Sequence, residues 1–264
     1  MKASNSGIQT FKQCRRMYQL KYLHGLEPVQ TADALVRGSK YHKIVEGILN
    51  GNSNDAFAEC DDPKIKAMGM AFKKYILPQI ESVDGVEEWF EYNTPSGHKV
   101  VGRIDAKKGL ELIEHKTISG LIDGAYFQKL EFDEQIPTYM LAFNTNWIKY
   151  TVCSTPSIRQ KKSESDEEFF WRCVEWFDED TEHKIAMVEL NRTNDELEEF
   201  QHEQDDILNE MNSCKLFYRN PSNCCKWGRM CDYASVCMNF DPDKEYIQFK
   251  RREDIYESSG EAEV

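Results

Sequence analysis

Two short stretches decide the fold: VGRID at residues 101–105 and, after a turn that contains a glycine, LIEHKT at residues 112–117. Short apolar runs separated by a glycine turn are typical of neighbouring antiparallel strands. On such strands Asp105 and Glu114 can face the same side of the sheet. Glu114 and Lys116 are two positions apart, so a strand presents both on one face. The pattern therefore predicts two carboxylates and one ammonium group in one place.

These three groups have the composition of a site that cleaves phosphodiesters. Two carboxylates can hold Mg²⁺ or Mn²⁺, and an ammonium group can position or deprotonate the attacking water. The alternative is a salt bridge between Glu114 and Lys116 on a strand edge. The apolar neighbours Ile104, Leu112 and Ile113 indicate strands embedded in a core, where charged groups are rarely found without a binding or catalytic role. They favour the functional interpretation.

The surrounding segments predict a mixed α/β fold. Apolar side chains at helical spacing and two capping boxes predict helices at residues 5–24, 34–50, 62–81, 123–143, 166–177 and 194–213. Short, partly alternating segments predict strands at residues 86–93, 99–106, 110–117, 147–154 and 183–190. The first three strands should form an antiparallel meander.

We expect one domain over residues 1–250. Its N-terminal helices would span residues 4–81, its catalytic core 86–213 and a cysteine-rich segment 214–240. Residues 251–264 are polar and acidic, which predicts a flexible tail.

Five motifs follow one another in an order that resembles a known family. They are Ser6-x4-Phe11-x2-Cys14-Arg15-Arg16 with Tyr22, Gly38-x3-His42-x3-Glu46, Gly102-Arg103-Ile104-Asp105, Glu114-His115-Lys116-Thr117, and Gln135-x3-Tyr139. This order resembles the RecB-type branch of the PD-(D/E)XK nuclease superfamily, which includes CRISPR-associated RecB-like exonucleases and phage exonucleases. Arg15 stands where the family usually has proline. The resemblance implies a restriction-endonuclease-like fold, a mixed sheet flanked by helices.

The resemblance also implies roles for individual residues. His42, Asp105, Glu114 and the backbone carbonyl of His115 would bind the metal ion, whereas the His115 side chain should point to the opposite sheet face. A lone histidine on a helix is more often an ordinary polar residue than a ligand. If His42 is a ligand, its imidazole beside two carboxylates would favour Mn²⁺.

Further along the chain, the same family pattern assigns Lys116 to orient or activate water. Gln135 and Tyr139 would hold Lys116 and the DNA strand. These two residues are four apart, so one face of a helix presents both.

The cysteines suggest a second metal centre. The chain has nine of them, and Cys224, Cys231 and Cys237 lie within 14 residues. Clustered thiolates suit an iron–sulfur cluster or zinc, with Cys225 as an alternative to Cys224. The resemblance implies Cys14 as the fourth ligand of a [4Fe–4S] cluster that ties the ends of the domain together. Partly buried, reduced thiols are the remaining alternative. The other four should be packing residues: Cys60, Cys153, Cys173 and Cys214.

Charge and hydropathy limit the partners. The net charge is -13, but residues 1–50 carry +5 and the remainder -18. A local basic face on an acidic protein predicts moderate, salt-sensitive DNA binding. Neither a membrane span nor a secretory signal is evident, so we expect no membrane partner and a cytoplasmic protein in a bacterium or a phage-infected cell.

The function that these observations favour is a divalent-metal-dependent DNA nuclease. The family resemblance points to an exonuclease that acts on DNA ends or single strands in recombination, repair or replication, where recombination or replication proteins are possible partners. The alternative is a DNA-binding module with a nuclease fold and a metal–thiolate cluster that does not cleave.

Overall fold

The computed structural model describes residues 1–29, 33–80, 82–226, 229–238 and 249–251. Contacts within the chain divide it into two compact units. Unit 1 comprises Met1–Thr31, Trp89–Gly102 and Glu198–Val264, and unit 2 comprises Ala32–Glu88 and Arg103–Leu197. Each unit is described below by itself. The single domain over residues 1–250 stays a prediction, and the predicted tail lies, apart from Arg251, outside the described residues.

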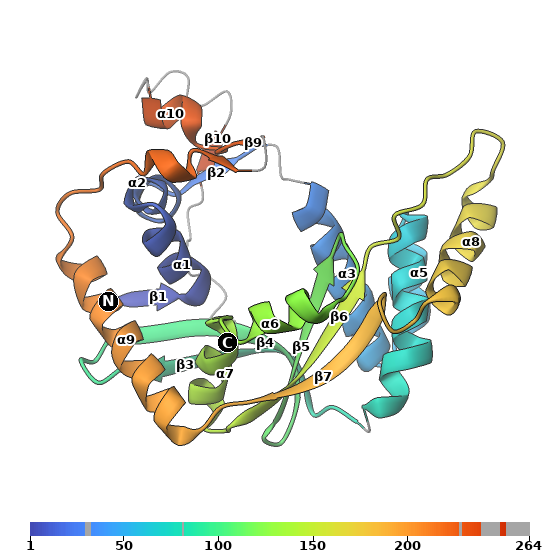
Figure 1. Cartoon of the computed structure of the whole chain (residues 1–264), viewed down its shortest axis with the longest axis horizontal. Helices are drawn as coiled ribbons and strands as arrows, with labels where there is room; N and C mark the ends of the chain where they lie inside the picture. Colours follow the sequence, from blue (N-terminus) through green and yellow to red (C-terminus); the bar gives the residue numbers. More distant parts are fainter. Residues whose placement is uncertain (30–32, 81, 227–228, 239–248, 252–264) are drawn as a thin grey trace, which may run out of the picture. The chain divides into compact units, whose positions relative to one another are not determined.

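The main sheet is mixed, as predicted (Figure 1). Its strands are β3 (Gly85–Asn93), β4 (Lys99–Lys108), β5 (Glu111–Ile118), β6 (Trp147–Ser154) and β7 (Ile185–Asn191). Residues 89–93 of β3 and 99–102 of β4 belong to unit 1, and the rest of these strands belongs to unit 2. Strand β3 pairs with β4, and β4 lies antiparallel to β5. Strand β5 runs parallel to β6, which is antiparallel to β7. Strand β5 is therefore hydrogen-bonded on both sides.

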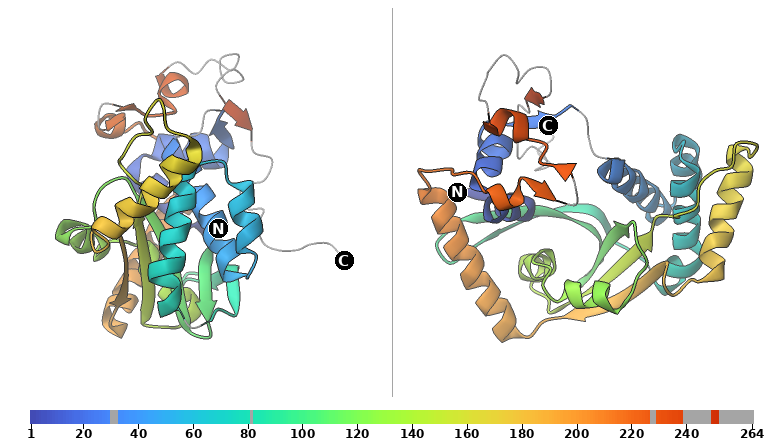
Figure 2. Two further views of the ribbon diagram at one scale, coloured as in Figure 1. Left: turned by 90° about the vertical axis from the view of Figure 1, so that its right-hand side faces the viewer. Right: turned by 45° about the horizontal axis from the view of Figure 1, so that its top comes forward.

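Helices pack on this sheet because their apolar side chains need a partner surface. The helices of unit 2 are α3 (Asp33–Leu49), α4 (Ser53–Glu59), α5 (Pro63–Ala71), α6 (Gly124–Leu130), α7 (Gln135–Phe143) and α8 (Asp166–Glu179). Helix α5 continues through a π-helical turn (Phe72–Ile76) and a 3₁₀ turn (Leu77–Gln79). It runs alongside α8 (Figures 1 and 2). One buried cluster unites α3, α5 and α8 with the strands, through residues that include Ile44, Met68, Ile113 and Phe177.

Unit 1 shows where local prediction failed. The expected helix 5–24 is broken into α1 (Asn5–Gln13), α2 (Arg15–Tyr18) and a π-helical turn (Gln19–Leu23), because Cys14 is extended (φ -164°, ψ 112°). The freed carbonyl of Gln13 accepts hydrogen bonds from the side-chain amides of Asn220 (2.9 Å) and Asn223 (2.8 Å). Long-range partners thus replace the helical hydrogen bonds at the break.

The remaining elements of unit 1 are short except for one helix. They are β1 (Lys2–Ser4), β2 (Leu26–Pro28), a 3₁₀ turn (Pro221–Asn223), β8 (Cys225–Lys226), β9 (Arg229–Met230), α10 (Ala234–Met238) and β10 (Phe249–Arg251). Strand β1 pairs in parallel with the start of β4, and β2 pairs with β10. The long helix α9 (Asn194–Ser213) begins in unit 2 and continues into unit 1. None of the helices in the described part of the chain combines the length and apolar character needed to cross a membrane.

Two further differences from the predicted elements have local causes. The expected helix 123–143 is two helices, because the Asp133 carboxylate accepts a hydrogen bond from the Gln135 N–H (2.9 Å) and starts α7 afresh. Helix α4 was not predicted. The two expected capping boxes are present, Ser165 with Glu168 and Thr193 with Glu196.

A buried carboxylate stabilises unit 1 and provides a stability prediction. Asp205 of α9 is 7% exposed, and it accepts hydrogen bonds from the hydroxyls of Thr94 and Ser96 and from the Ser96 N–H. Replacing Asp205 with alanine should lower the free energy of unfolding by about 2–3 kcal/mol, because three donors lose a charged acceptor. Urea unfolding of the full chain measures this. Asp206→Ala, at an exposed position of the same helix, should change stability by less than about 0.5 kcal/mol. Equal losses for both variants would contradict the assignment.

Candidate active site in unit 2

One pocket of unit 2, about 690 Å³ in volume, is lined by six of the predicted site residues. Helix α3 contributes His42, β4 contributes Asp105, β5 contributes Glu114 and Lys116, and α7 contributes Gln135 and Tyr139. The two strand residues of β5 share a face because they are two positions apart. The register of β4 against β5, in which Ala106 faces Ile113, brings Asp105 beside Glu114.

Asp105 lies between two donors. Its Oδ1 is 3.2 Å from Nδ1 of His42, and its Oδ2 accepts a hydrogen bond from the His115 N–H (2.7 Å). Burial alone would raise the pKa of Asp105, but the hydrogen bond and charge of His42 hold it well below the ordinary value. Burial would lower the pKa of His42, and Asp105 more than offsets this and raises it. Asp105 is therefore ionised and accessible to a cation across the neutral pH range.

Glu114 is the most deeply buried carboxylate of the pocket. It is 2% exposed, its Oε1 accepts a hydrogen bond from the Lys116 ammonium group, and its Oε2 has no hydrogen-bond partner among the described residues. Burial, reinforced by the Asp105 charge, raises the pKa of Glu114 to about 8 although Lys116 is adjacent. A buried oxygen without a donor is costly unless a cation approaches it. This carboxylate therefore suits a divalent ion, which would supply the missing partner.

Lys116 is held by a chain of side chains from α7. Its ammonium group also donates to Oε1 of Gln135 (2.8 Å), and Nε2 of Gln135 donates to the Tyr139 hydroxyl (2.5 Å). The Tyr139 hydroxyl in turn donates to the backbone carbonyl of Arg103 on β4 (3.2 Å). Lys116 is thus fixed next to Glu114. This ammonium group could hold or orient water beside a bound ion.

The His115 side chain does not line the pocket. It is buried, with Nδ1 2.6 Å from the Thr151 hydroxyl and its ring edge-on to Phe72 at 5.3 Å. Burial lowers the pKa of His115 to about 4, so the ring is neutral. The side chain is a packing group, and only its backbone carbonyl is available for the predicted ligand role.

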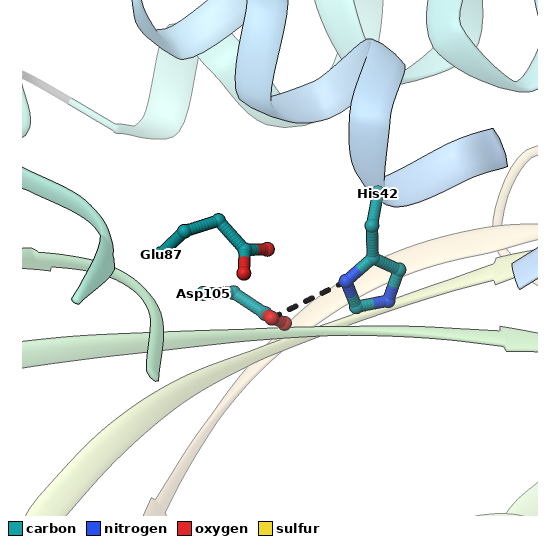
Figure 3. A group of neighbouring side chains, drawn as sticks. All are labelled: His42, Glu87 and Asp105. Carbon is teal, nitrogen blue, oxygen red and sulfur yellow. Dashed lines mark ion pairs between the residues drawn. The ribbon is translucent and has the colours of Figure 1, made fainter. Parts of the chain in front are cut away.

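Glu87 lines the same pocket and was not predicted. It lies on β3 with a left-handed backbone (φ 54°), and its carboxylate pairs with Arg103 at 2.5 Å. One potential ligand atom each from His42, Glu87 and Asp105 lies within 4.8 Å of the others (Figure 3). In the sequence, Glu87 is one of two adjacent glutamates in a predicted strand that carries several charges, which is an ordinary pattern. No residue pattern predicts a left-handed backbone at a glutamate.

The predicted cluster cysteines all lie in unit 1. All nine cysteines lie in the described part of the chain, and none of them forms a disulfide there. Cys14 sits at the break between α1 and α2, and the Cys231 N–H donates to the Cys224 carbonyl (2.8 Å). Burial raises the pKa of the Cys231 thiol, and Cys231 and Cys237 pack against the same buried cluster of unit 1. Three of the expected packing cysteines, Cys60, Cys153 and Cys173, are buried in unit 2. The fourth, Cys214, is partly exposed in unit 1.

Comparison with known proteins gives the family. A family model described as the PD-(D/E)XK nuclease superfamily matches residues 2–238. The chain belongs to the PD-(D/E)XK nuclease superfamily. The E-x-K triplet in the family's name is present in this chain as Glu114-His115-Lys116. No curated protein matches the chain in sequence.

Several solved structures resemble the chain at low sequence identity. A protein of Eubacterium rectale that was assigned as an exonuclease is 14% identical, with a TM-score of 0.51 over 89% of this chain and 86% of its own. An alkaline exonuclease of Laribacter hongkongensis is 13% identical, with a TM-score of 0.43 over 80% of this chain and 88% of its own. A phage-related exonuclease of Haemophilus somnus is 16% identical, with a TM-score of 0.37 over 74% and 93%. The likeness to the Eubacterium rectale protein concerns the fold alone.

The pKa values of the pocket predict how stability depends on pH in this PD-(D/E)XK protein without metal. Glu114 titrates near pH 8 in the folded chain and near its ordinary value of 4.5 when unfolded. The folded state therefore holds a proton that the unfolded state has released. This stabilising effect is complete below pH 4.5 and is lost as the pH rises through about 8. The raised pKa of His42 acts in the same direction.

In EDTA, the free energy of unfolding should fall from pH 6 to pH 8, by at most about 1.4 kcal/mol per pH unit for each proton. Urea unfolding at several pH values measures the slope. Glu114→Gln should flatten it, and Mn²⁺ should reverse it because the ion binds the ionised carboxylate. A wild-type slope that the substitution leaves unchanged would exclude Glu114 as its source.

Proposed function

We propose that this chain is a divalent-metal-dependent deoxyribonuclease with its active site in the pocket of unit 2. The observation that carries the proposal is the buried Glu114 carboxylate, which has one oxygen on Lys116 and the other without a donor, next to the ionised Asp105. Two such carboxylates and a fixed ammonium group are what metal-assisted phosphodiester hydrolysis requires.

Each residue has a distinct task in this proposal. Asp105, Glu114, the His115 carbonyl and His42 would hold Mg²⁺ or Mn²⁺, which supplies a Lewis acid and an activated water when bound. Lys116 orients that water and neutralises charge that develops on the phosphate. Gln135 positions Lys116. Tyr139 in turn fixes Gln135, because its hydroxyl accepts a hydrogen bond from Gln135 and donates one to the β4 backbone. The mixed ligands, an imidazole and two carboxylates, favour Mn²⁺ over Mg²⁺.

The substrate that we propose is DNA, with hydrolysis from ends or on single strands. Exonuclease action follows from the resemblance to RecB-type enzymes and rests on that analogy. A role in recombination, repair or replication, in the cytoplasm of a bacterium or phage-infected cell, belongs to the same proposal. Recombination or replication proteins would then be the partners.

We also propose that Cys14, Cys224, Cys231 and Cys237 hold a [4Fe–4S] cluster in unit 1. In support, Cys231 and Cys237 pack against one buried cluster of unit 1, and the Cys231 N–H donates to the Cys224 carbonyl (2.8 Å).

Removal of the active-site ammonium group tests the nuclease proposal. Lys116→Ala should lower the rate of DNA degradation in Mn²⁺ by about 10²–10³-fold or more, because charge on the phosphate loses its fixed cation. Release of nucleotides from labelled single- and double-stranded DNA measures the rate. Lys129→Ala removes an exposed ammonium group from α6 and should leave the rate within about twofold.

The outcomes separate the rival functions. Equal cleavage by wild type and Lys116→Ala would refute the active-site assignment. DNA binding without cleavage by either protein would favour the non-cleaving DNA-binding module. Labelling the DNA at one end in the same assay would also give the polarity of degradation.

The cluster has an independent spectroscopic test. Protein purified without oxygen should be brown and absorb near about 400 nm, as thiolate-ligated iron clusters do. Cys231→Ser should bleach this band, whereas Cys214→Ser should retain it. A colourless protein with one zinc per chain would show that the site is a zinc site instead.

A further inference from the structure

The face of helix α3 that carries His42 continues beyond the proposed metal site. His42 projects from α3 toward Asp105 in Figure 3. Residues three, four and seven positions apart share one face of a helix, so Leu35 and Ser39 lie on the His42 face. Both residues line the pocket of unit 2, and so does Gly38. No task in the proposed hydrolysis falls to this part of the pocket wall.

Leu35 is an apolar side chain in a wall of polar ones. It is 66% exposed, and apart from the buried Tyr139 it is the only large apolar side chain among the described residues that line the pocket. A single exposed leucine elsewhere on a protein surface is ordinary. In a pocket proposed to bind DNA, an apolar side chain cannot bind a phosphate oxygen, whereas the face of a nucleobase is an apolar partner for it.

Gly38 leaves the wall flat beside Leu35. Among the described residues, a Cβ atom at this position would meet only Oγ1 of Thr117, at 3.6 Å, which is an ordinary van der Waals contact. The protein therefore has room for alanine at position 38, although it has glycine, which lowers the stability of a helix. Glycine suits a position where a ligand approaches the backbone closely. Leu35 and Gly38 together form a flat surface with an apolar edge.

The distance from Gly38 to His42 suits one nucleotide. Four residues of a helix rise about 6 Å, so a base at Gly38 lies about one helical turn from an ion held by His42. The exposed cations Lys43 and Arg103 line the same pocket and can contact phosphate groups. In a duplex, the neighbours in the stack cover both faces of a base, so only an unpaired and unstacked base exposes a face to a side chain.

We infer that Leu35 and Gly38 bind the face of one unpaired nucleobase, in a DNA strand whose phosphate lies at the proposed metal site. This inference rests on the proposed nuclease function. It adds that the strand is unpaired where it is cleaved, so that single strands and frayed ends are the substrates. Helix α3 contributes the contact that selects them.

A double-mutant cycle between protein and DNA tests this contact without cleavage. The ligand is a short single-stranded phosphorothioate oligonucleotide, which resists hydrolysis, with an abasic site placed at each position in turn. Fluorescence anisotropy with the full chain in Mn²⁺ should reveal one position where loss of the base weakens wild-type binding by about fivefold to tenfold. Leu35→Ala should weaken binding of the intact oligonucleotide by a similar factor, and it should lose nothing further at that position.

Val36→Ala is the matched control, because Val36 is the neighbouring apolar residue of α3, is 40% exposed and does not line the pocket. Its affinity should stay within about twofold of wild type, with the effect of the abasic site retained. Leu35→Met keeps an apolar side chain of similar volume and should restore binding to within about threefold. Additive losses at every position, or equal effects of Leu35→Ala and Val36→Ala, would overturn the inference.

Gly38→Ala separates the binding surface from the stability of the helix. Thermal unfolding in EDTA should show an unchanged or higher midpoint, because alanine favours the helix. The added methyl group would stand where we place the base, so the affinity for the oligonucleotide should fall by about tenfold or more. A Gly38→Ala chain that binds the oligonucleotide as tightly as wild type would contradict the proposed surface.

Cleavage kinetics distinguish this inference from the nuclease proposal. Leu35→Ala should act mainly by raising KM for single-stranded DNA, whereas Lys116→Ala should lower kcat. An additive cycle together with an inactive Lys116→Ala would overturn the base-binding surface while the nuclease proposal stands. A non-additive cycle together with equal cleavage by wild type and Lys116→Ala would refute the active site and leave a surface that binds single strands.

Discussion

The burial of Glu114 in a strand that is paired on both sides is the constraint on which the site depends. Strands β4 and β6 hold β5 in the interior of the sheet of unit 2, and the carboxylate is left 2% exposed. Such a charge is tolerated only when cations or donors meet it. Lys116 meets one oxygen, and α7 keeps Lys116 in place through Gln135. Lys116, Gln135 and Tyr139 thus form a chain of hydrogen bonds that ends on this one group.

Much of this arrangement was predictable because it is local. A two-residue period puts Glu114 and Lys116 on one face and sends His115 to the other, and the structure of β5 agrees. The helix starts after Ser165 and Thr193 were predictable for the same reason, since a capping box needs residues only three positions apart. The mixed α/β fold and the nuclease superfamily, inferred from the sequence motifs, are confirmed.

What could not be predicted depends on partners far along the chain. Apolar spacing favours one helix over residues 5–24, but Asn220 and Asn223 bond the Gln13 carbonyl and stabilise a break at Cys14. Glu87 was missed for a similar reason. Its backbone is left-handed (φ 54°), and an isolated pair of glutamates in a strand carries no sign of this. The assignment of ligand roles to individual residues goes beyond what strand and helix periodicity can supply.

The break at Cys14 has a consequence for the order in which the protein is made. Unit 1 is assembled from the first, a middle and the last part of the chain, whereas every residue of the proposed nuclease site lies within Ala32–Glu88 and Arg103–Leu197. The Gln13 carbonyl receives its partners only after residue 223 has left the ribosome, because synthesis proceeds from the N-terminus. A nascent chain therefore has all the groups of the pocket of unit 2 before unit 1 can be completed. Unit 1 can be completed only after Asn220 and Asn223 have been synthesised.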